Sequence, residues 1–494
     1  MKQKYVKLLL VAILTIGLTS CADFLEGVQT DVITDSQLQG DVGIASAHSF
    51  LAGAYRGLFN PGAAQQSHDD FGLRAIMLAT DMMADDAAIY QRGFFFAFDY
   101  ANDNRLPTFR RPRNTWRQLY AVILAANTAL EVFKGLEYQT AETNRAMGEA
   151  LALRGYMHFV LVNMFQQPYS VNRDALGIPI RRSSSNDVRP GRNTVAEVYE
   201  VILADLFEAF DLLEGKGMRT PATISEYVVA GMLARVLPFV NSHPNQWVEV
   251  ARFAGIAAQG SPLMTTQAEF SSGFYDIRLN EVLWGSAIDI ETNTFFASFF
   301  SNIDPFSAGY AGEIGFPILI ASYLYNRIDP QDLRYAWFAD GTEPWLTAGS
   351  YLPRYTAVKF TEHGRPGFTA DYIYMRSSEF FYVKAEALFL NGDEAGARSA
   401  LEAVMSTRLA GYSAAHLSGQ ALLNEIRIQK RIDTWGDGRR LFDMKWRGEA
   451  MDRRGSTNHN PNFPMYFDPN PKEWIFMIPR EEMDANRYIT ENNP

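Results

Sequence analysis

Two stretches of the sequence place aromatic rings beside acidic side chains. The first reads TDMMADDAAIYQRGFFFAFDYANDN, and the second combines IDPFSAGYAG with EPWLTAGSY. A sugar presents CH-rich ring faces edged with hydroxyl groups, so aromatic planes beside Asp, Asn or Arg are typical of a carbohydrate site. Any one of these aromatic residues is more typical of the hydrophobic core than of a binding surface. The prediction of a carbohydrate site therefore depends on several of them occurring together. The candidate ligand-binding residues are Asp81, Asp85, Tyr90, Phe94, Phe95, Phe306, Tyr310, Trp345 and Tyr351.

The sequence contains no recognisable catalytic constellation. A glycosidase needs two carboxylates roughly 5 to 9 Å apart, whereas neighbours such as Asp85 and Asp86, or Asp69 and Asp70, usually point to different sides. The histidines show no metal-like spacing, and no serine lies in a G-x-S-x-G elbow. His158 lies in a helical pattern and is expected in the core. We therefore predict a binding protein without catalytic residues, metal or cofactor; bound calcium stays open, although the Asp residues show no EF-hand spacing.

Helical periodicity dominates the segments that must position these residues. Apolar side chains recur every three or four positions in residues 114–135 and 145–165, which places them on one helix face. A third helix is predicted at 194–215, where Thr194 and Glu197 have the spacing of a capping box.

Two further segments, 225–260 and 376–408, each read as a pair of antiparallel helices with small residues at the expected contact. They resemble degenerate tetratricopeptide units, and generic helical hairpins are the alternative. Residues 260–366 are rich in Gly, Pro, Ser and aromatics, which predicts long loops with a few short strands, and residues 81–113 read as a similar loop. Loops of this length are usually functional.

The N-terminus has the pattern of an export signal. Lysines at positions 2, 4 and 7 precede an apolar stretch, 8–18, that is shorter than the roughly 20 residues of a membrane span. Leu18-Thr19-Ser20-Cys21 resembles the lipobox of bacterial lipoproteins, in which Cys21, the only cysteine, becomes the lipid-bearing first residue. The alternative is a buried or reactive free thiol. We expect a signal peptide at 1–20 and a body that is anchored to a membrane without spanning it.

Composition restricts the class of partner. The 494 residues are 47% hydrophobic and 20% charged, which is ordinary for a globular chain with a substantial core. The formal net charge is -11, and removal of the signal peptide would take away three lysines and no acid. Nucleic acid is therefore excluded as a partner, because binding to phosphates needs a basic surface.

Seven segments, taken in order along nearly the whole chain, resemble the RagB/SusD family of Bacteroidetes outer-membrane lipoproteins. They are SCADFLEG, TWRQLYAVILAANTALE, EALALRGYMHFVLVNMFQQPY with GIPI, ATISEYVVAGMLARV, MRSSEFFYVKAEALFLNGD, RIQKRIDTWGDGRRLFDMKWRG and WIFMIPREEMDANRYITENN. The chain departs from the family pattern at three places. Asp437 replaces the usual glutamate, Gln429 begins a triplet that is commonly Glu-Arg-Arg, and Arg487 stands where proline often follows Asn486.

These matched segments are expected to be structural. Arg431, Arg439 and Arg440 as donors and Asp443 as acceptor would make charge-assisted hydrogen bonds that hold loops on the helical core. The tryptophans of the matched segments, Trp116, Trp284, Trp435 and Trp446, are expected in the core.

The resemblance implies a mostly α, SusD-like fold with scattered tetratricopeptide-like helix pairs, long loops and a few short strands. The body, 21–494, would comprise an N-terminal half, about 21–260, and a loop-rich C-terminal half, about 261–494. The resemblance also implies a non-catalytic lid at the cell exterior, lipid-anchored to the outer membrane. Such a lid captures oligosaccharides and passes them to a partner SusC-like TonB-dependent barrel.

Two alternatives remain from sequence alone. Some relatives are associated with peptide capture, and an acidic surface suits basic peptides through long-range attraction. A purely structural helical-repeat lipoprotein is the other.

Overall fold

The structure is a computed structural model that describes residues 40–60, 67–90, 95–136, 138–185, 190–345, 350–362 and 366–494. Within these residues the fold is mostly α, as predicted, with 49% helix and 6% strand. The predicted signal peptide, the lipidation site Cys21 and the candidate Phe94 lie outside the described residues.

Helices make up nearly all of the regular structure in the first half of the described chain. Its elements are α2 (Gly40–Gly57), α3 (Leu73–Met83), β1 (Ala87–Ile89), α4 (Ala97–Tyr100), α5 (Arg110–Gly135), α6 (Ala141–Phe165), α7 (Tyr169–Asn172), α8 (Val195–Leu213), α9 (Glu226–Val236), η2 (Leu237–Phe239) and α10 (Gln246–Ala257). The three helices predicted around residues 114–135, 145–165 and 194–215 are thus confirmed as α5, α6 and α8.

The second half has shorter elements in its central part and longer helices near its end. They are α11 (Gln267–Phe270), β2 (Val282–Ser286), α12 (Phe299–Ile303), β3 (Ile318–Ile320), α13 (Ser322–Tyr325), η3 (Leu333–Trp337), η4 (Pro366–Phe368), β4 (Tyr372–Arg376), α14 (Ser377–Leu390), α15 (Glu394–Met405), α16 (Gly419–Asp433), α17 (Arg440–Arg447), β5 (Met451–Asp452), β6 (Tyr466–Phe467), η5 (Lys472–Trp474) and α18 (Arg480–Ala485).

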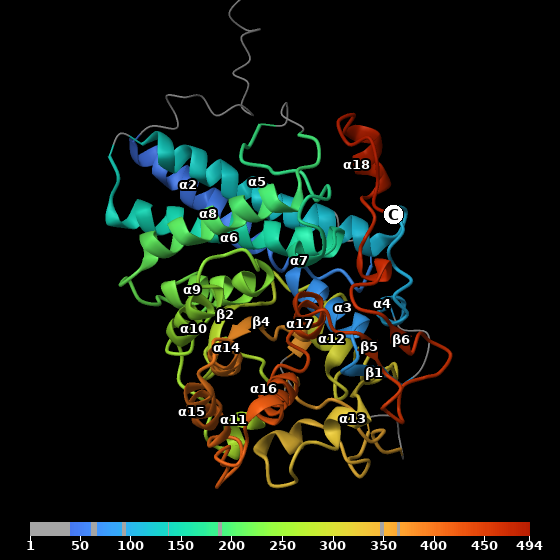
Figure 1. Ribbon diagram of the computed structural model, residues 1–494. Coiled ribbons are helices and arrows are strands. Elements are labelled where there is room, and N and C mark those ends of the chain that lie inside the picture. Colours follow the sequence, from blue (N-terminus) through green and yellow to red (C-terminus); the bar gives the residue numbers. More distant parts are fainter. Residues whose placement is uncertain are drawn as a thin grey trace, which may run out of the picture.

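Helices α2, α5, α6 and α8 pack side by side at the upper left of Figure 1. Helix α6 is buried along almost its whole length and forms the centre of this layer. Two glycines allow α8 to approach α6 closely, because a Cβ at Gly155 would lie 3.0 Å from Cβ of Asp205, and one at Gly148 would lie 2.9 Å from Cγ of Leu213. Helix α8 begins with the predicted capping box, in which Thr194 accepts a hydrogen bond from the backbone N–H of Glu197 and the Glu197 carboxylate accepts one from that of Thr194.

Both predicted helical hairpins are present. Helices α9 and α10 pack against each other, α10 also packs on α14, and α14 packs on α15 and α16 (Figure 1). The small residues expected at these contacts are buried at Ala230, Ala254, Ala385 and Ala397. A separate small core lies among α14, α15 and α16, beside one main core that includes residues from both predicted halves of the chain. The division at about residue 260 stays a prediction.

The strands of the described residues form three antiparallel pairs. Strand β1 pairs with β3, β2 with β4, and β5 with β6. In the first pair Ala88 faces Leu319, so the stretch that follows α3 lies against the central segment of the chain. The prediction of loops with a few short strands between 260 and 366 is confirmed by β2, β3 and the short helices around them.

The prediction of a loop over residues 81–113 is wrong in part. Helix α3 continues through Asp81 to Met83, β1 and α4 lie within the stretch, and α5 already begins at Arg110. Every residue of α3 is buried, including the polar Arg74, Thr80 and Asp81, so the helix has no solvent-exposed face.

The expected core tryptophans are confirmed in three cases. Trp116, Trp284 and Trp435 are at most 4% exposed, whereas Trp446 is half-buried and packs on Trp247 with ring centroids 5.6 Å apart.

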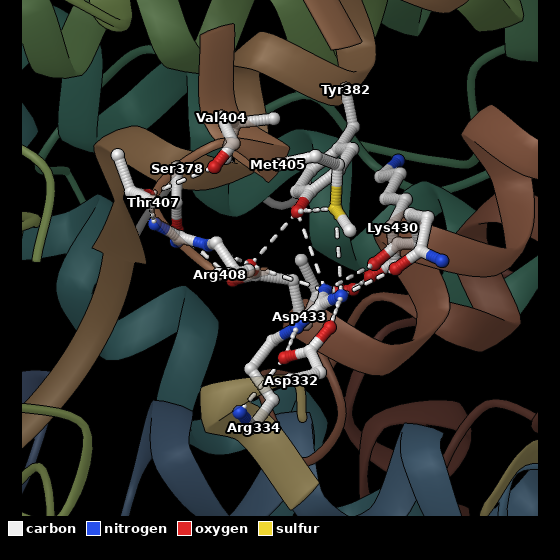
Figure 2. A network of polar contacts seen from close by, with 12 residues as sticks. Asp332, Arg334, Ser378, Tyr382, Val404, Met405, Thr407, Arg408, Lys430 and Asp433 are labelled. Atoms are coloured by element: carbon white, nitrogen blue, oxygen red, sulfur yellow. Dashed lines mark hydrogen bonds and ion pairs between the residues drawn. The ribbon is translucent and has the colours of Figure 1, made fainter. Parts of the chain in front are cut away.

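A buried network of charges links the second-half elements to one another. Asp433, at the end of α16, accepts hydrogen bonds from Nε of Arg408 at 2.9 Å and from the Tyr382 hydroxyl at 3.0 Å (Figure 2). Arg376, at the end of β4, donates to Asp433 at 3.1 Å and to Glu281 at 2.9 Å. Since none of these side chains reaches solvent, each charge is compensated only by its partners.

Candidate functional site

An open hollow of about 430 Å³ brings together two of the predicted site residues, Phe95 and Tyr310. Its lining comes from four parts of the chain: the residues before α3, the residues before α4, the first residue of α5, and the segment around α12 (Figure 1). This volume is within the range usual for small-ligand sites. The lining residues are Ser67, His68, Phe95, Arg110, Thr294, Ala297 and Tyr310.

The rings of the hollow pack edge to face and leave ring surface open to solvent. Phe95 and Tyr310 lie 5.3 Å apart between centroids at 81°, and His68 lies 6.1 Å from Phe95. Phe296, which is 41% exposed, stacks on His68 at 6.0 Å with an angle of 18° between the planes. An aromatic surface of this kind can hold the CH face of a sugar ring.

Hydrogen bonds fix the orientation of these rings. His68 Nδ1 and the Tyr310 hydroxyl share a hydrogen bond of 2.7 Å, and Asn302 on α12 donates to the carbonyl of His68 at 3.2 Å. Burial and the Asp69 carboxylate raise the pKa of the Tyr310 phenol. Tyr310 therefore stays protonated at neutral pH.

Arg110 contributes a positive charge to the hollow. Its guanidinium carbon lies 5.4 Å from the centroid of the Phe95 ring, and 39% of its side chain is exposed. Its neighbour Arg111 points inward instead, where Nη2 contacts Asp99 at 2.8 Å and Asp69 at 3.2 Å. These buried ion pairs fix the backbone that carries both Arg110 and His68.

A second group of predicted residues surrounds Tyr90. Tyr90 is 47% exposed, and its ring meets the edge of the Trp345 ring with centroids 6.3 Å apart. Trp345 is half-buried, and Tyr351, which is 64% exposed, pairs with Pro344 in an isolated β-bridge of the same segment. These three aromatics thus form a second partly exposed group, outside the lining of the hollow.

The two predicted carboxylates lie inside the protein. Asp81 is 5% exposed and accepts a hydrogen bond of 2.7 Å from the backbone N–H of Gly438; burial raises its pKa to about 7. Asp85 is 7% exposed and accepts hydrogen bonds of 2.7 and 3.1 Å from Arg440. Burial by itself raises the pKa of Asp85, but the guanidinium groups of Arg440 and Arg431 hold it well below its usual range. Because both carboxylates are occupied by internal partners, they are not part of the binding surface proposed below.

The structural role expected for the C-terminal arginines is confirmed. Arg431 donates to Asp86 at 3.0 Å and Arg440 to Asp85, so α16 and α17 hold the stretch between α3 and β1. Arg439 contacts Glu379 at 3.1 Å, and Asp443 accepts a hydrogen bond of 2.8 Å from Lys430. This clamp positions the chain just before Tyr90 and Phe95.

The remaining predicted residue, Phe306, is 42% exposed and lies in the loop that leads to Tyr310. Its backbone N–H donates to Asp304 at 2.8 Å. It does not line the hollow.

Sequence reasoning missed His68 and Arg110, which line the hollow, and Phe296, which lies outside the lining and stacks on His68. Arg110 stands in the run Arg-Arg-Pro-Arg that opens α5, and Phe296 in TNTFFASFF, so each lies in a stretch that had been read as a functional loop. His68 gave no signal, because its partner Tyr310 is 242 positions away.

Within the described residues, no group of three or more His, Cys, Asp or Glu side chains is arranged to hold a metal ion. None of the helices in the same part of the chain is long and apolar enough to cross a bilayer.

Two family models match the chain. A SusD-like model, described as starch-binding and associating with the outer membrane, matches residues 31–237, and the model of the SusD family matches residues 338–494. No curated protein matches the chain.

Solved structures share the fold over nearly the whole chain. A SusD-like carbohydrate-binding protein from Bacteroides vulgatus is similar with a TM-score of 0.78 and 22% identity, over 90% of this chain and 97% of that one. A SusD superfamily protein from Bacteroides thetaiotaomicron gives 0.75 and 21%, over 91% and 99%. Surface glycan-binding protein A from Bacteroides fluxus gives 0.70 and 16%, over 91% and 99%.

Proposed function

The chain belongs to the SusD/RagB family, and we propose that it captures oligosaccharides at the cell surface and passes them to a SusC-like TonB-dependent transporter. The observation that carries this proposal is the hollow, in which three rings from separate parts of the chain converge with their faces partly open. Relatives of the same fold from Bacteroides vulgatus and Bacteroides fluxus bear names that refer to carbohydrate or glycan binding, which supports the choice of ligand.

Capture in this proposal involves no bond cleavage. Hydrolysis of a glycosidic bond needs a pair of carboxylates that flank the bond. Among the described residues that line the hollow, none is Asp or Glu. The chemistry available there is ring stacking and hydrogen bonding, both of which are reversible.

The membrane anchor in this proposal is a lipid on Cys21, with the body facing the cell exterior. The description of the matching family model as associating with the outer membrane supports this location.

The peptide alternative has less support from the site. A net charge of -11 favours basic peptides at long range. The hollow itself, however, presents the guanidinium of Arg110, which repels a basic ligand at short range.

A titration of the mature protein against a panel of oligosaccharides and peptides tests the proposal. We expect oligosaccharides to bind, and we expect Phe95→Ala to weaken that binding by about 1 to 3 kcal/mol, because a stacking surface is lost. Isothermal calorimetry gives the affinities, and tryptophan fluorescence follows binding independently. Tyr90→Ala and Trp345→Ala test the second aromatic group in the same way.

The matched control is Phe98→Ala, since Phe98 is 55% exposed on α4, close to Phe95 in sequence, and outside the lining of the hollow. Its affinity should equal that of the wild type. Binding of peptides but of no oligosaccharide, or release of cleaved sugar during the titration, would overturn the proposal.

A further inference from the structure

Arg110 offers only N–H donors to the hollow. The hydroxyl of Ser67 already donates to Asp69 and that of Thr294 to the carbonyl of Ala297, and the Tyr310 hydroxyl shares a hydrogen bond with His68. No carboxylate lines the hollow among the described residues, although the chain as a whole carries a net charge of -11. Carboxylates are the usual acceptors for the hydroxyl groups of a neutral sugar. A ligand group that pairs with Arg110 must therefore bring acceptors of its own.

The charge of Arg110 is only weakly compensated within the protein. Its one ion pair with a described residue is long, at 3.9 Å between Nη2 and Oδ1 of Asp69. A guanidinium has five N–H donors, so this single long contact leaves most of them available. Because 39% of the side chain is exposed in an open hollow, these donors are accessible to a ligand.

Asp69 is itself already committed to other partners. Its Oδ2 lies 3.2 Å from Nη2 of Arg111, and its Oδ1 accepts a hydrogen bond from Ser67. Its backbone carbonyl accepts a further bond from Arg111 at 2.9 Å. The Asp69 side chain is 3% exposed. It therefore cannot move closer to Arg110 and neutralise its charge without breaking the buried ion pair with Arg111.

We infer that the hollow recognises sugars that carry an anionic group, a carboxylate or a sulfate ester, through Arg110. The inference rests on the proposed function and specifies its ligand class. A guanidinium binds such groups by paired, charge-assisted hydrogen bonds. The Arg110 guanidinium lies over the Phe95 ring, 5.4 Å from its centroid, so an anionic group bound by the guanidinium lies beside the aromatic rings of the hollow.

The experiment is a calorimetric titration of the full mature chain. The probes are a galacturonate tetramer and a hyaluronan tetrasaccharide for the carboxylate, and a κ-carrageenan tetramer for the sulfate. Each is paired with its neutral counterpart, in which the carboxyl groups are reduced or the sulfates removed. We expect at least one anionic probe to bind at least tenfold more tightly than its neutral counterpart, and the arm that responds identifies the anionic group.

The variant Arg110→Gln should remove most of that preference and change the affinity for neutral sugars by less than threefold. Arg110→Lys should restore part of the preference, because it keeps the charge and loses the fork of donors. The matched control is Arg117→Gln, which removes the same charge from an exposed position on α5 and should leave every affinity unchanged. Thermal melting of each variant confirms that it is folded.

The possible failures are distinguishable. Equal or tighter binding of the neutral counterparts, or an anionic preference that survives in Arg110→Gln, overturns the inference and leaves the proposed function standing. Binding of acidic peptides in place of all sugars overturns both, and so does the absence of binding by every sugar, neutral or anionic.

Discussion

At the scale of single residues, Asp433 shows how strongly the buried charges depend on one another. Burial raises the pKa of its carboxyl, but the guanidinium groups of Arg408, Arg376 and Arg334 hold it well below the usual range. We predict that Asp433→Asn lowers the free energy of unfolding at pH 7 by about 3 to 5 kcal/mol, because it leaves buried cations without their partner. Denaturant titration measures this loss. The control Asp452→Asn breaks a surface ion pair in which the Asp452 side chain is 44% exposed and the Arg454 side chain is 58% exposed. This substitution should lower the free energy of unfolding by less than about 1 kcal/mol.

The sign of the pH dependence follows from the lowered pKa of Asp433. A carboxyl with a lowered pKa in the folded state contributes stability that is present above its unfolded pKa, near 4, and is lost as the pH falls through the folded value. The difference between wild type and Asp433→Asn should therefore narrow below about pH 4. A difference that stayed constant into acid would contradict the assignment of the charge to Asp433.

The role of a single residue could be predicted from the sequence only where a local sequence pattern indicates it. The roles of Arg431, Arg439 and Arg440 as structural anchors were predictable, because these residues stand in a matched family segment. Asp85 was predicted to bind the ligand. The local sequence around a carboxylate is the same whether the carboxylate binds a sugar or pairs with an arginine 355 positions away. His68 was not predictable for the same reason: its function as a wall of the hollow depends on contacts that no local pattern encodes.

At the scale of elements, the packing of α9 depends on the absence of a side chain at Gly231. A Cβ there would lie 2.6 Å from Sδ of Met375 and 2.6 Å from Cζ of Phe380, both fully buried on β4 and α14. We predict that Gly231→Ala lowers the free energy of unfolding by about 1 to 3 kcal/mol, because overpacking outweighs the gain in helix propensity of roughly 1 kcal/mol. Thermal and denaturant unfolding measure the change.

Gly53→Ala in α2 is the matched control for this prediction. Nothing lies within 4 Å of a Cβ at Gly53, so only the helix propensity changes, and the variant should be at least as stable as the wild type. Equal effects of the two substitutions would show that packing between α9, β4 and α14 is not what makes Gly231 necessary.

The sequence predicted elements well where they are amphipathic or capped. The hairpins α9–α10 and α14–α15 and the start of α8 at Thr194 follow from periodicity and capping chemistry, which act within a few residues. Helix α3 was not predicted, and its burial on every side does not explain this, because α6 is buried almost as completely and was predicted. The hollow escaped prediction because its lining comes from four segments that only the tertiary fold brings together.

At the scale of the whole molecule, Glu149 joins three parts of the helical layer. Its carboxylate in α6 accepts a hydrogen bond of 2.6 Å from the hydroxyl of Tyr55 in α2, and that hydroxyl accepts one of 2.9 Å from the backbone N–H of Ile224 between α8 and α9. Burial raises the pKa of Glu149 to about 7. A raised pKa contributes stability that is present below the unfolded value, near 4.5, and is lost as the pH rises through about 7.

We predict that Glu149→Gln becomes more stable relative to the wild type as the pH rises from about 4.5 to 8. The glutamine keeps an acceptor for Tyr55 and has no charge to bury. The gain is at most about 3.5 kcal/mol, since one pKa unit corresponds to about 1.4 kcal/mol. Unfolding curves at intervals of one pH unit measure it. A relative stability that is independent of pH would contradict the raised pKa.

The clamp between Arg431 and Asp86 spans 345 positions of the chain. During synthesis the ribosome therefore completes the segment that carries Phe95 long before it makes the arginines that hold this segment in place. A protein that is cut short before α16 keeps every ring of the hollow and loses the means to arrange them. Truncations before α16 should consequently abolish the proposed ligand capture as completely as deletion of the rings themselves, because the last 76 of the 494 residues complete the hollow.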